Sequence, residues 1–298
     1  MILLDYSQVA LANIFQFQKD LRKDNSNPEA VNIIRHAVLT GVKSFRKKYG
    51  RQYGEVVLAC DGRNYWRKDI FPYYKAGRKA SRDSMNLDWK LVFDTISSIR
   101  DDLAEHFPYK VLHFDDIEGD DIIATLALWT QTNGLQDKGI FEEKQPVLIV
   151  SSDGDYKQLH RFDNIKQWSP VQNKFVTSSH PRSELLEKIA KGDTGDGIPN
   201  VLSDDAVLVT EGVRQKKMMQ SRLDEFSSKG REACRTDEER RNWDRNDQLI
   251  NFEKIPVTIQ SRIVDGYINS KPKGDKMSIY NYLVKNRCRL LLNDIEEF

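Results

Sequence analysis

Residues 147–156 read Val-Leu-Ile-Val-Ser-Ser-Asp-Gly-Asp-Tyr. The four apolar residues form a run of the length expected for a buried strand, and Asp153 and Asp155 follow it within a few positions. The same pattern occurs twice earlier, where Ile2-Leu3-Leu4 precedes Asp5 and residues 56–60 precede Asp61. Because continuous apolar strands are typical of parallel sheets, the pattern predicts a parallel sheet with carboxylates at its strand ends.

The alternation of strand and helix patterns extends this prediction. Strands are expected at residues 2–5, 55–60, 109–113 and 146–151, and helices near 28–48, 87–106 and 119–132. This order indicates an α/β fold with a mainly parallel central sheet flanked by helices. Two short runs, 166–168 and 175–177, are expected to form a hairpin at one edge.

The sequence after Pro181 is expected to be helical to its end. Residues 211–248 are so rich in charge that we expect exposed or mobile helices there. Apolar periodicity returns between 259 and 292 and predicts packed helices.

Composition limits the class of protein. The chain has 298 residues, of which 39% are hydrophobic, which suffices for an ordinary core. No apolar stretch approaches the roughly 18 residues that span a bilayer, so we expect a cytoplasmic protein with no membrane contact. Cys60, Cys234 and Cys288 are odd in number and form no C-x-x-C pair, which argues against a disulfide framework or a thiolate zinc site.

The net charge of +1 conceals a segregation of charge along the chain. Basic residues are enriched in 63–82, 214–231 and 271–289, whereas the acids gather in short motifs. Carboxylates flanked by basic segments suit a metal-dependent enzyme that acts on a phosphate backbone. Any one basic window taken alone is better explained as a solvated face.

The acidic motifs predict a metal centre. Besides the strand-end aspartates, Glu118-Gly119-Asp120-Asp121 opens a helix and Gly192-Asp193-Thr194-Gly195-Asp196-Gly197 forms a glycine-rich turn. The carboxyl ends of parallel strands share one sheet edge, so these acids can converge. Oxygen ligands with all five histidines elsewhere favour hard divalent ions over zinc. Each motif alone could be a helix cap or an Asx turn, but five together favour the metal site.

The motifs also resemble a known family. Residues 117–124, 149–159 and 192–199, in this order after the strand-end aspartates, resemble the flap endonucleases and 5'-to-3' exonucleases. Residues 65–69, 165–170 and 293–298 are similar to the ribonuclease H group of T-even-type bacteriophages. The resemblance implies an α/β catalytic domain at 1–180 with a helical arch at about 67–90. It also implies a helical DNA-binding domain at 181–298, with a helix-hairpin-helix-like segment at about 185–210.

The resemblance assigns roles to residues and implies two or more Mg²⁺ ions, for which Mn²⁺ can substitute. One ion would lie among Asp5, Asp61, Glu118 and Asp120 with Asp121 nearby, and the second among Asp153, Asp155, Asp193 and Asp196, partly through water. In the arch, Lys75 and Arg78 would face the scissile phosphate, Tyr74 would stack on a base, and Lys79 and Arg82 would bind nucleic acid. A basic surface turn with buried tyrosines is the alternative for this segment.

One segment departs from the family pattern. The family has a glycine-rich hairpin after the last acidic motif, but residues 200–206 here read Asn-Val-Leu-Ser-Asp-Asp-Ala. The resemblance therefore does not imply binding of duplex or of a monovalent cation at this segment. We expect the basic stretch with Arg214, Lys216 and Lys217 to bind nucleic acid instead.

The resemblance implies a monomeric 5'-to-3' nuclease that removes RNA primers in phage replication. Its partners would be DNA and RNA–DNA hybrids, forked or flapped, together with a single-strand DNA-binding protein. Two other classes remain open on the residues alone: a non-catalytic module that binds branched DNA, and a magnesium-dependent phosphatase.

Overall fold

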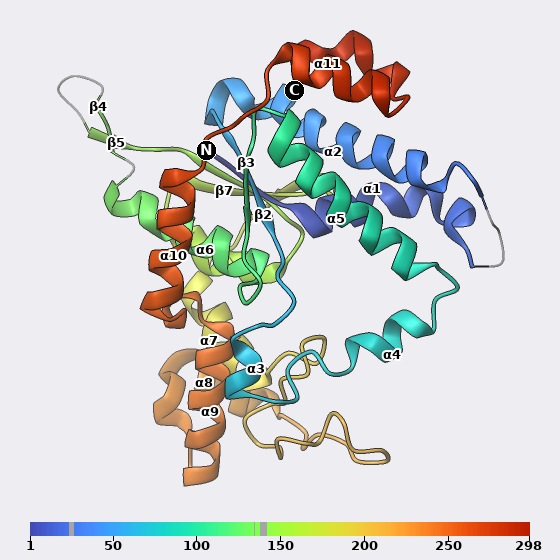
Figure 1. The fold of residues 1–298 in the computed structure, drawn as a ribbon. Helices are drawn as coiled ribbons and strands as arrows, with labels where there is room; N and C mark the ends of the chain where they lie inside the picture. Colours follow the sequence, from blue (N-terminus) through green and yellow to red (C-terminus); the bar gives the residue numbers. More distant parts are fainter. Residues whose placement is uncertain (24–26, 134, 138–141) are drawn as a thin grey trace.

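A computed structural model of the chain describes residues 1–23, 27–133, 135–137 and 142–298. Its centre is a six-stranded sheet (Figure 1), whose strands lie in the order β3 (Lys110–His113), β2 (Val56–Cys60), β1 (Ile2–Asp5), β6 (Val147–Val150), β7 (Ile165–Ser169) and β8 (Lys174–Val176). All neighbours are parallel except β7 and β8. The prediction of a mainly parallel sheet with one edge hairpin is confirmed.

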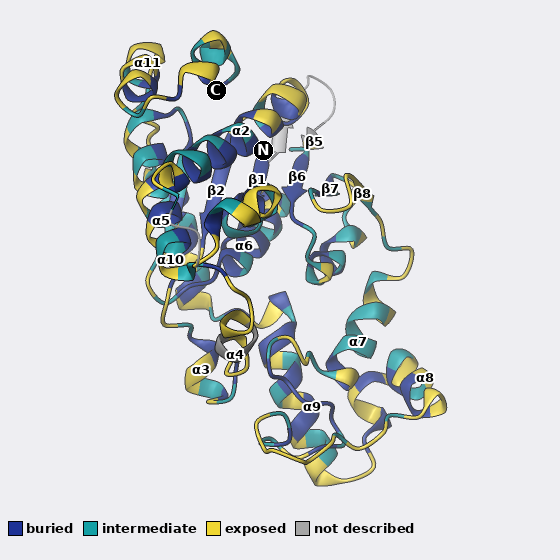
Figure 2. Ribbon diagram, turned by 90° about the vertical axis from the view of Figure 1, so that its right-hand side faces the viewer, coloured by how far each residue is buried: buried dark blue, intermediate teal, exposed yellow. Residues whose placement is uncertain are grey.

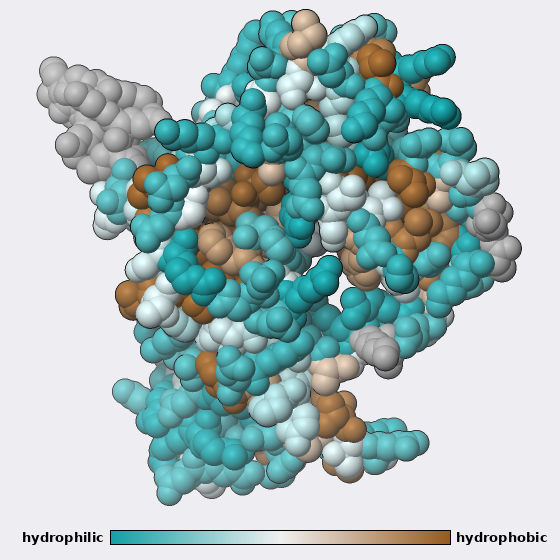
Figure 3. Space-filling model, viewed as in Figure 1, coloured by the Kyte–Doolittle hydropathy of each residue, from teal (hydrophilic) through white to brown (hydrophobic). Residues whose placement is uncertain are grey.

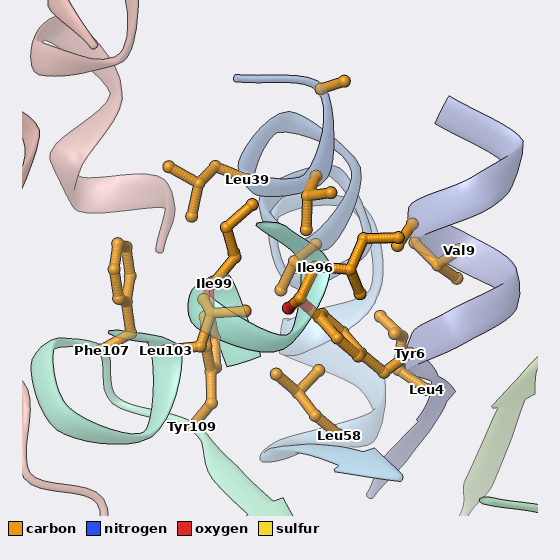
Figure 4. Close-up of a cluster of buried hydrophobic side chains, with 14 of the residues drawn as sticks. Leu4, Tyr6, Val9, Leu39, Leu58, Ile96, Ile99, Leu103, Phe107 and Tyr109 are labelled. Atoms are coloured by element: carbon orange, nitrogen blue, oxygen red, sulfur yellow. The ribbon is translucent and has the colours of Figure 1, made fainter. Parts of the chain in front are cut away.

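Helices cover both faces of the sheet. On one face lie α1 (Tyr6–Ile14), α2 (Ala30–Tyr53) and α5 (Trp89–His106), and on the other α6 (Gly119–Asn133) and α10 (Val257–Asn269). Alternate strand residues explain this arrangement, since Leu4 and Leu58 belong to the first core and Leu3 and Val57 to the second. Figure 4 shows the first core, in which Leu4 and Leu58 lie beneath side chains from α5.

Several short elements were not predicted. Asp5 accepts a hydrogen bond from the backbone N–H of Gln8 and thereby caps α1, which continues into a 3₁₀ helix, η1 (Phe15–Leu21). A small separate hairpin pairs β4 (Leu135–Asp137) with β5 (Glu142–Lys144). Two short helices, α3 (Arg67–Ile70) and α4 (Arg78–Asp83), connect β2 to α5.

The first helices after residue 180 form a third core. They are α7 (Pro181–Lys191), α8 (Gln220–Lys229) and α9 (Asp237–Ile250), with the 3₁₀ helix η3 (Gly230–Ala233) between the last two. Leu223, Phe226 and Trp243 are buried, so the expectation of exposed helices throughout 211–248 is wrong. Exposed residues lie on the outward faces of α8 and α9, whereas the buried residues lie on their inner faces (Figure 2).

The remaining helices return to the sheet. Ile263 of α10 packs in the core beside α6, and Leu283 of α11 (Lys276–Lys285) joins the core beside α5. Two 3₁₀ helices, η4 (Phe252–Lys254) and η5 (Arg289–Glu297), complete this part. The domain division at residue 180 stays a prediction, and packing contacts cross it.

The surface shown in Figure 3 is mainly hydrophilic, with hydrophobic side chains in separate patches. Within the described residues, no helix combines the length and apolar character needed to cross a membrane. Cys60, Cys234 and Cys288 are free thiols, and all three are buried.

Candidate metal centre

Three aspartates meet at the carboxyl edge of the sheet. Asp5 ends β1, Asp61 follows β2, and Asp153 lies shortly after β6, which is the neighbour of β1. Burial and the nearby charges of Asp61 and Asp153 raise the pKa of Asp5 to about 7. The structure therefore brings together acids that are far apart in sequence, as the parallel arrangement requires.

Helix α6 adds a fourth acid to this cluster. The backbone N–H of Gly119 donates to Asp61 Oδ1 at 2.8 Å, and a Cβ at position 119 would lie 3.2 Å from that oxygen. Glycine thus lets the helix start close against Asp61. Asp120 Oδ1 accepts from Tyr156 Oη at 2.6 Å, and burial together with Asp153 and Asp5 raises the pKa of Asp120 well above its usual value.

These four acids form what we call the open group: Asp5, Asp61, Asp120 and Asp153. In the described part of the chain, none of the four forms an ion pair with a lysine, arginine or histidine. Close anions that repel one another and lack a counter-ion favour a bound cation, and their hard oxygen donors suit a divalent ion. Among the described residues, however, no three side chains are already arranged as ligands of one ion.

A second set of acids lies beside the open group, and we call it the paired group: Asp155, Asp193 and Asp196. Lys188 forms ion pairs with Asp155 and with Asp193, the latter at 2.9 Å, and Arg78 Nη2 lies 2.6 Å from Asp196 Oδ1. Asp120 and these three acids line one cleft, so the two groups face a shared space.

Glu118 and Asp121 have a different environment from the other acids. Asp121 is fully buried, and its two oxygens accept from Arg67 Nη2 at 2.8 Å and from Trp66 Nε1 at 2.8 Å. Glu118 accepts from Arg67 and from Lys75. Burial would raise the pKa of Glu118, but Lys75 and Arg67 hold it below its usual value. Asp121 therefore belongs to a buried ion pair with Arg67, whereas Glu118 lies between that ion pair and the cleft.

A cavity of about 730 Å³ lies beside the segment that joins β2 to α5. Its lining includes Asp61, Lys75, Arg78, Arg82 and Arg100. Lys75 has a φ of 58°, which is uncommon for a residue other than glycine and is typical of functional sites that hold backbone strain. The cavity thus brings Asp61 of the open group near several basic side chains.

Tight backbone contacts fix Lys75 beside the paired group. Its N–H donates to the carbonyl oxygen of Asp196 at 2.7 Å. Gly197 has a φ of 73°, and a Cβ there would lie 2.7 Å from the carbonyl oxygen of Tyr73. The glycine-rich turn and the arch are therefore in direct contact, and a side chain at 197 would push them apart.

The other residues predicted to contact nucleic acid differ in how far they are exposed. Tyr74 is buried, and its hydroxyl donates to Glu118 and Asp196, so the tyrosine expected to stack on a base packs inside instead. Arg82 is exposed and lies over Phe93, and the side chain of Lys79 falls outside the described residues. The remaining three basic residues are exposed: Arg214, Lys216 and Lys217.

Sequence reasoning missed three residues of the site: Arg67, Tyr156 and Lys188. Each donates to an acid of a predicted motif. Tyr156 follows Asp155 directly, and Lys188 precedes Asp193 by about one helical turn, so proximity in sequence could have suggested these two. Arg67 is separated from Asp121 by 54 residues, and only the fold reveals that contact.

The fold and site together define a class: a nuclease whose carboxylates meet at the edge of a parallel sheet beneath a cationic arch. Comparison with protein families agrees with this class. Residues 1–189 match the model described as 5'-3' exonuclease, N-terminal resolvase-like domain, and residues 179–298 match that described as T4 RNase H, C terminal. The chain belongs to the 5'-3' exonuclease family.

Individual relatives extend the comparison. The chain is 34% identical to the ribonuclease H of Enterobacteria phage T4 over 99% of its own length and 95% of that protein. It is 33% identical to the flap endonuclease Xni of Shewanella pealeana over 46% of this chain and 48% of that one.

Solved structures share the fold at lower sequence identity. The T5 5'-exonuclease with bound zinc ions has a TM-score of 0.57 at 13% identity, over 91% of this chain and 98% of that one. The bacteriophage T5 flap endonuclease in complex with DNA and metal ions has a TM-score of 0.57 at 15% identity, over 89% and 98%.

Proposed function

We propose that this chain is a Mg²⁺-dependent 5'-to-3' nuclease that cleaves phosphodiester bonds near 5' ends of RNA–DNA and DNA duplexes and at 5' flaps. In a phage-infected cell it would remove RNA primers during DNA replication. The observation that carries the proposal is the open group, in which Asp5, Asp61, Asp120 and Asp153 lie close together and form no ion pair within the described residues. Asp61 of this group also lines the basic cavity.

The open and paired groups, with Glu118, are the residues that would hold the ions. Bound Mg²⁺ supplies an activated water and stabilises charge on the leaving oxygen. Mn²⁺ has similar ligand preferences and is expected to substitute for it. Asp121 is left out of this ligand set because Arg67 and Trp66 take both of its oxygens.

Lys75 and Arg78 are proposed to act on the phosphate. Both line the cavity and both contact acids of the site, so they lie where a backbone phosphate would approach the open group. Their cations would stabilise the charge that develops on the phosphoryl oxygens. A substrate phosphate would compete for them with Glu118 and Asp196.

The decisive experiment is cleavage by variants that lose one charge at the site. Asp120→Asn and Asp155→Asn should each lower the cleavage rate of a 5'-labelled RNA–DNA hybrid and of a flap by roughly 10²-fold or more in Mg²⁺. Binding of the substrate should survive or tighten, because one repulsive charge is removed. Asp265→Asn, which alters an exposed acid of α10, is the matched control and should cleave normally.

The alternatives predict other results. A non-catalytic module would bind the flap equally in Mg²⁺ and in EDTA and cleave it in neither. A phosphatase would release phosphate from small esters and leave the labelled strands intact. Product mapping also separates exonuclease from flap cleavage, since the first yields mononucleotides or short fragments and the second the intact flap.

The remaining partners and the location are part of the proposal. Forked or flapped DNA and RNA–DNA hybrids are the proposed substrates, and a single-strand DNA-binding protein is the proposed replication partner. The chain would act as a monomer in the cytoplasm of the host cell. Sedimentation of the purified protein with and without a flap substrate would test the monomeric state.

A further inference from the structure

The acids of the site differ in how their charge is balanced. Among the described residues, the hydrogen-bond donors that reach the carboxylates of the open group are neutral. Asp5 accepts from Ser151 Oγ at 3.1 Å, and Asp120 accepts from Tyr156 Oη at 2.6 Å. In the paired group, by contrast, a charged donor, the ammonium group of Lys188, reaches both Asp155 and Asp193.

Helix α7 aims Lys188 into the site. The next residues, Ile189 and Ala190, are buried in the third core, and the carbonyl oxygen of Ile189 accepts from Asn246 Nδ2 at 2.8 Å. The side chain of Lys188 is 28% exposed, whereas that of Lys191, on the same helix, is 51% exposed and pairs with Glu187. The helix is therefore held in place, and only one of its two lysines points toward the acids.

Lys188 connects two separate segments of the site. Asp155 belongs to the 3₁₀ helix η2 (Gly154–Arg161), and Asp193 begins the glycine-rich turn after α7. Asp193 Oδ1 is already held by the backbone N–H of Gly195 at 2.9 Å, which leaves Oδ2 for Lys188 at 2.9 Å. A single ammonium group thus lies between two carboxylates that would otherwise repel each other.

We propose that Lys188 is a built-in counter-ion that keeps Asp155 and Asp193 together before the second divalent ion binds and that competes with this ion for them. The inference rests on the proposed metal dependence and assigns a positioning role rather than a catalytic one. A lysine is a point charge on a flexible stem, so its ammonium group can move aside when a divalent ion arrives. Within the described residues, no lysine or arginine forms a comparable ion pair with the open group.

The two groups should therefore bind ions with different affinities. An ion at the open group relieves repulsion and displaces no protein cation. An ion at the paired group must replace Lys188, and the displaced ammonium charge stays near it. We expect one tightly bound and one weakly bound ion in the protein without nucleic acid.

The test is a titration of the full chain with Mn²⁺, in which bound ions are counted by electron paramagnetic resonance and calorimetry. Lys188→Met keeps a similar side-chain length and removes the charge. This substitution should increase the affinity for the weakly bound Mn²⁺ ion by roughly tenfold or more. The affinity for the tightly bound ion should stay nearly unchanged. Lys191→Met is the matched control, because it removes a lysine of the same helix that pairs with Glu187.

A second variant keeps the inference testable if Lys188→Met does not fold. Lys188→Arg preserves the charge, so it should bind the second Mn²⁺ as weakly as the parent chain. Unchanged weak binding in Lys188→Met, or tightening in Lys188→Arg, would overturn the role of Lys188. Absence of any Mn²⁺ binding to the parent chain would instead overturn the proposed metal dependence, so the two failures are distinguishable.

Discussion

The guanidinium group of Arg67 forms a two-point ion pair with the carboxylate of Asp121 inside the protein, with Nη2–Oδ1 at 2.8 Å and Nη1–Oδ2 at 3.0 Å. Arg67 also donates to Glu118 Oε2 at 2.6 Å and to the carbonyl oxygen of Leu249 at 2.9 Å. One side chain thereby joins the short helix α3, helix α6 and helix α9 of the C-terminal part.

Removal of this arginine should therefore destabilise the whole chain. Arg67→Met leaves Asp121 buried without its paired arginine and removes a cation that also pairs with Glu118, which is expected to cost about 3–5 kcal/mol in the free energy of unfolding measured with urea. Arg262→Met is the control, because it breaks an exposed pair with Asp116 and should cost about 1 kcal/mol or less. Equal effects of the two substitutions would contradict the central role of Arg67.

The open group should make the metal-free protein sensitive to pH. The pKa of Asp5 rises from 3.8 to about 7 on folding, because of burial and then of Asp61. The folded state thus binds this proton more tightly than the unfolded state, and the resulting stabilisation, complete below pH 4, is lost as the pH rises through 7. In EDTA at pH 8, Asp5→Asn should be more stable than the parent by about 1–3 kcal/mol, and the difference should shrink toward pH 4. Thermal unfolding between pH 4 and pH 8 measures the stability of the parent and of Asp5→Asn. A stability difference that stays constant over this range would contradict the raised pKa of Asp5.

Bound divalent ions should offset the destabilisation that the ionised open group causes in the metal-free protein. An ion that binds only the folded chain stabilises it by about 2.7 kcal/mol at a hundred times its dissociation constant. Mg²⁺ should accordingly raise the melting temperature of the parent chain, and EDTA should lower it again. Asp61→Asn, which removes one open-group charge, should respond much less, while Asp265→Asn should respond like the parent. An equal response of all three proteins would place the ion elsewhere.

Local sequence patterns were sufficient to predict the sheet and the position of the acids. The strands β1, β2 and β6 are short apolar runs, and Asp5, Asp61 and Asp153 end or closely follow them, so these features are encoded within a few residues. The ion-pair partner of a charged side chain, by contrast, is not determined by its neighbours in the sequence. Arg67 and Lys188 resemble other basic residues in the sequence, and their contacts with Asp121 and Asp155 depend on how the helices pack.

Tyr74 shows the same limit for aromatic residues. An aromatic ring in a basic segment can stack on a base or join a core, and the sequence permits both. Here the ring lies in the third core with Phe71, while its hydroxyl donates to Glu118 and Asp196. The charged helices α8 and α9 are a further case, because their apolar residues are few but lie on one face.

The turn at 200–206 holds the basic stretch 214–217, a role that its composition did not indicate. The backbone N–H of Asn200 donates to Gln215 Oε1 at 2.7 Å, and Ser203 Oγ accepts from the N–H of Lys216 at 2.9 Å. Asp205 pairs with Arg241 at 2.9 Å and with Arg245, so its charge is balanced within the protein. The turn therefore holds the stretch 214–217 through Gln215 and Lys216, and Arg214, Lys216 and Lys217 are exposed.

This arrangement leads to a prediction for duplex binding. Each phosphate neutralised by a protein cation contributes about 0.9 to the slope of log affinity against log salt. Replacement of Arg214, Lys216 and Lys217 by alanine should therefore reduce the magnitude of that slope by about 2–3 for a flap with a long downstream duplex, measured by fluorescence anisotropy. Replacement of Lys271, Lys273 and Lys276 by alanine is the matched control and should leave the slope unchanged, because Lys273 and Lys276 pair with acids of the protein itself. If the control alone lowered the slope, the duplex would lie against the C-terminal helices and the role given to the basic stretch would be wrong.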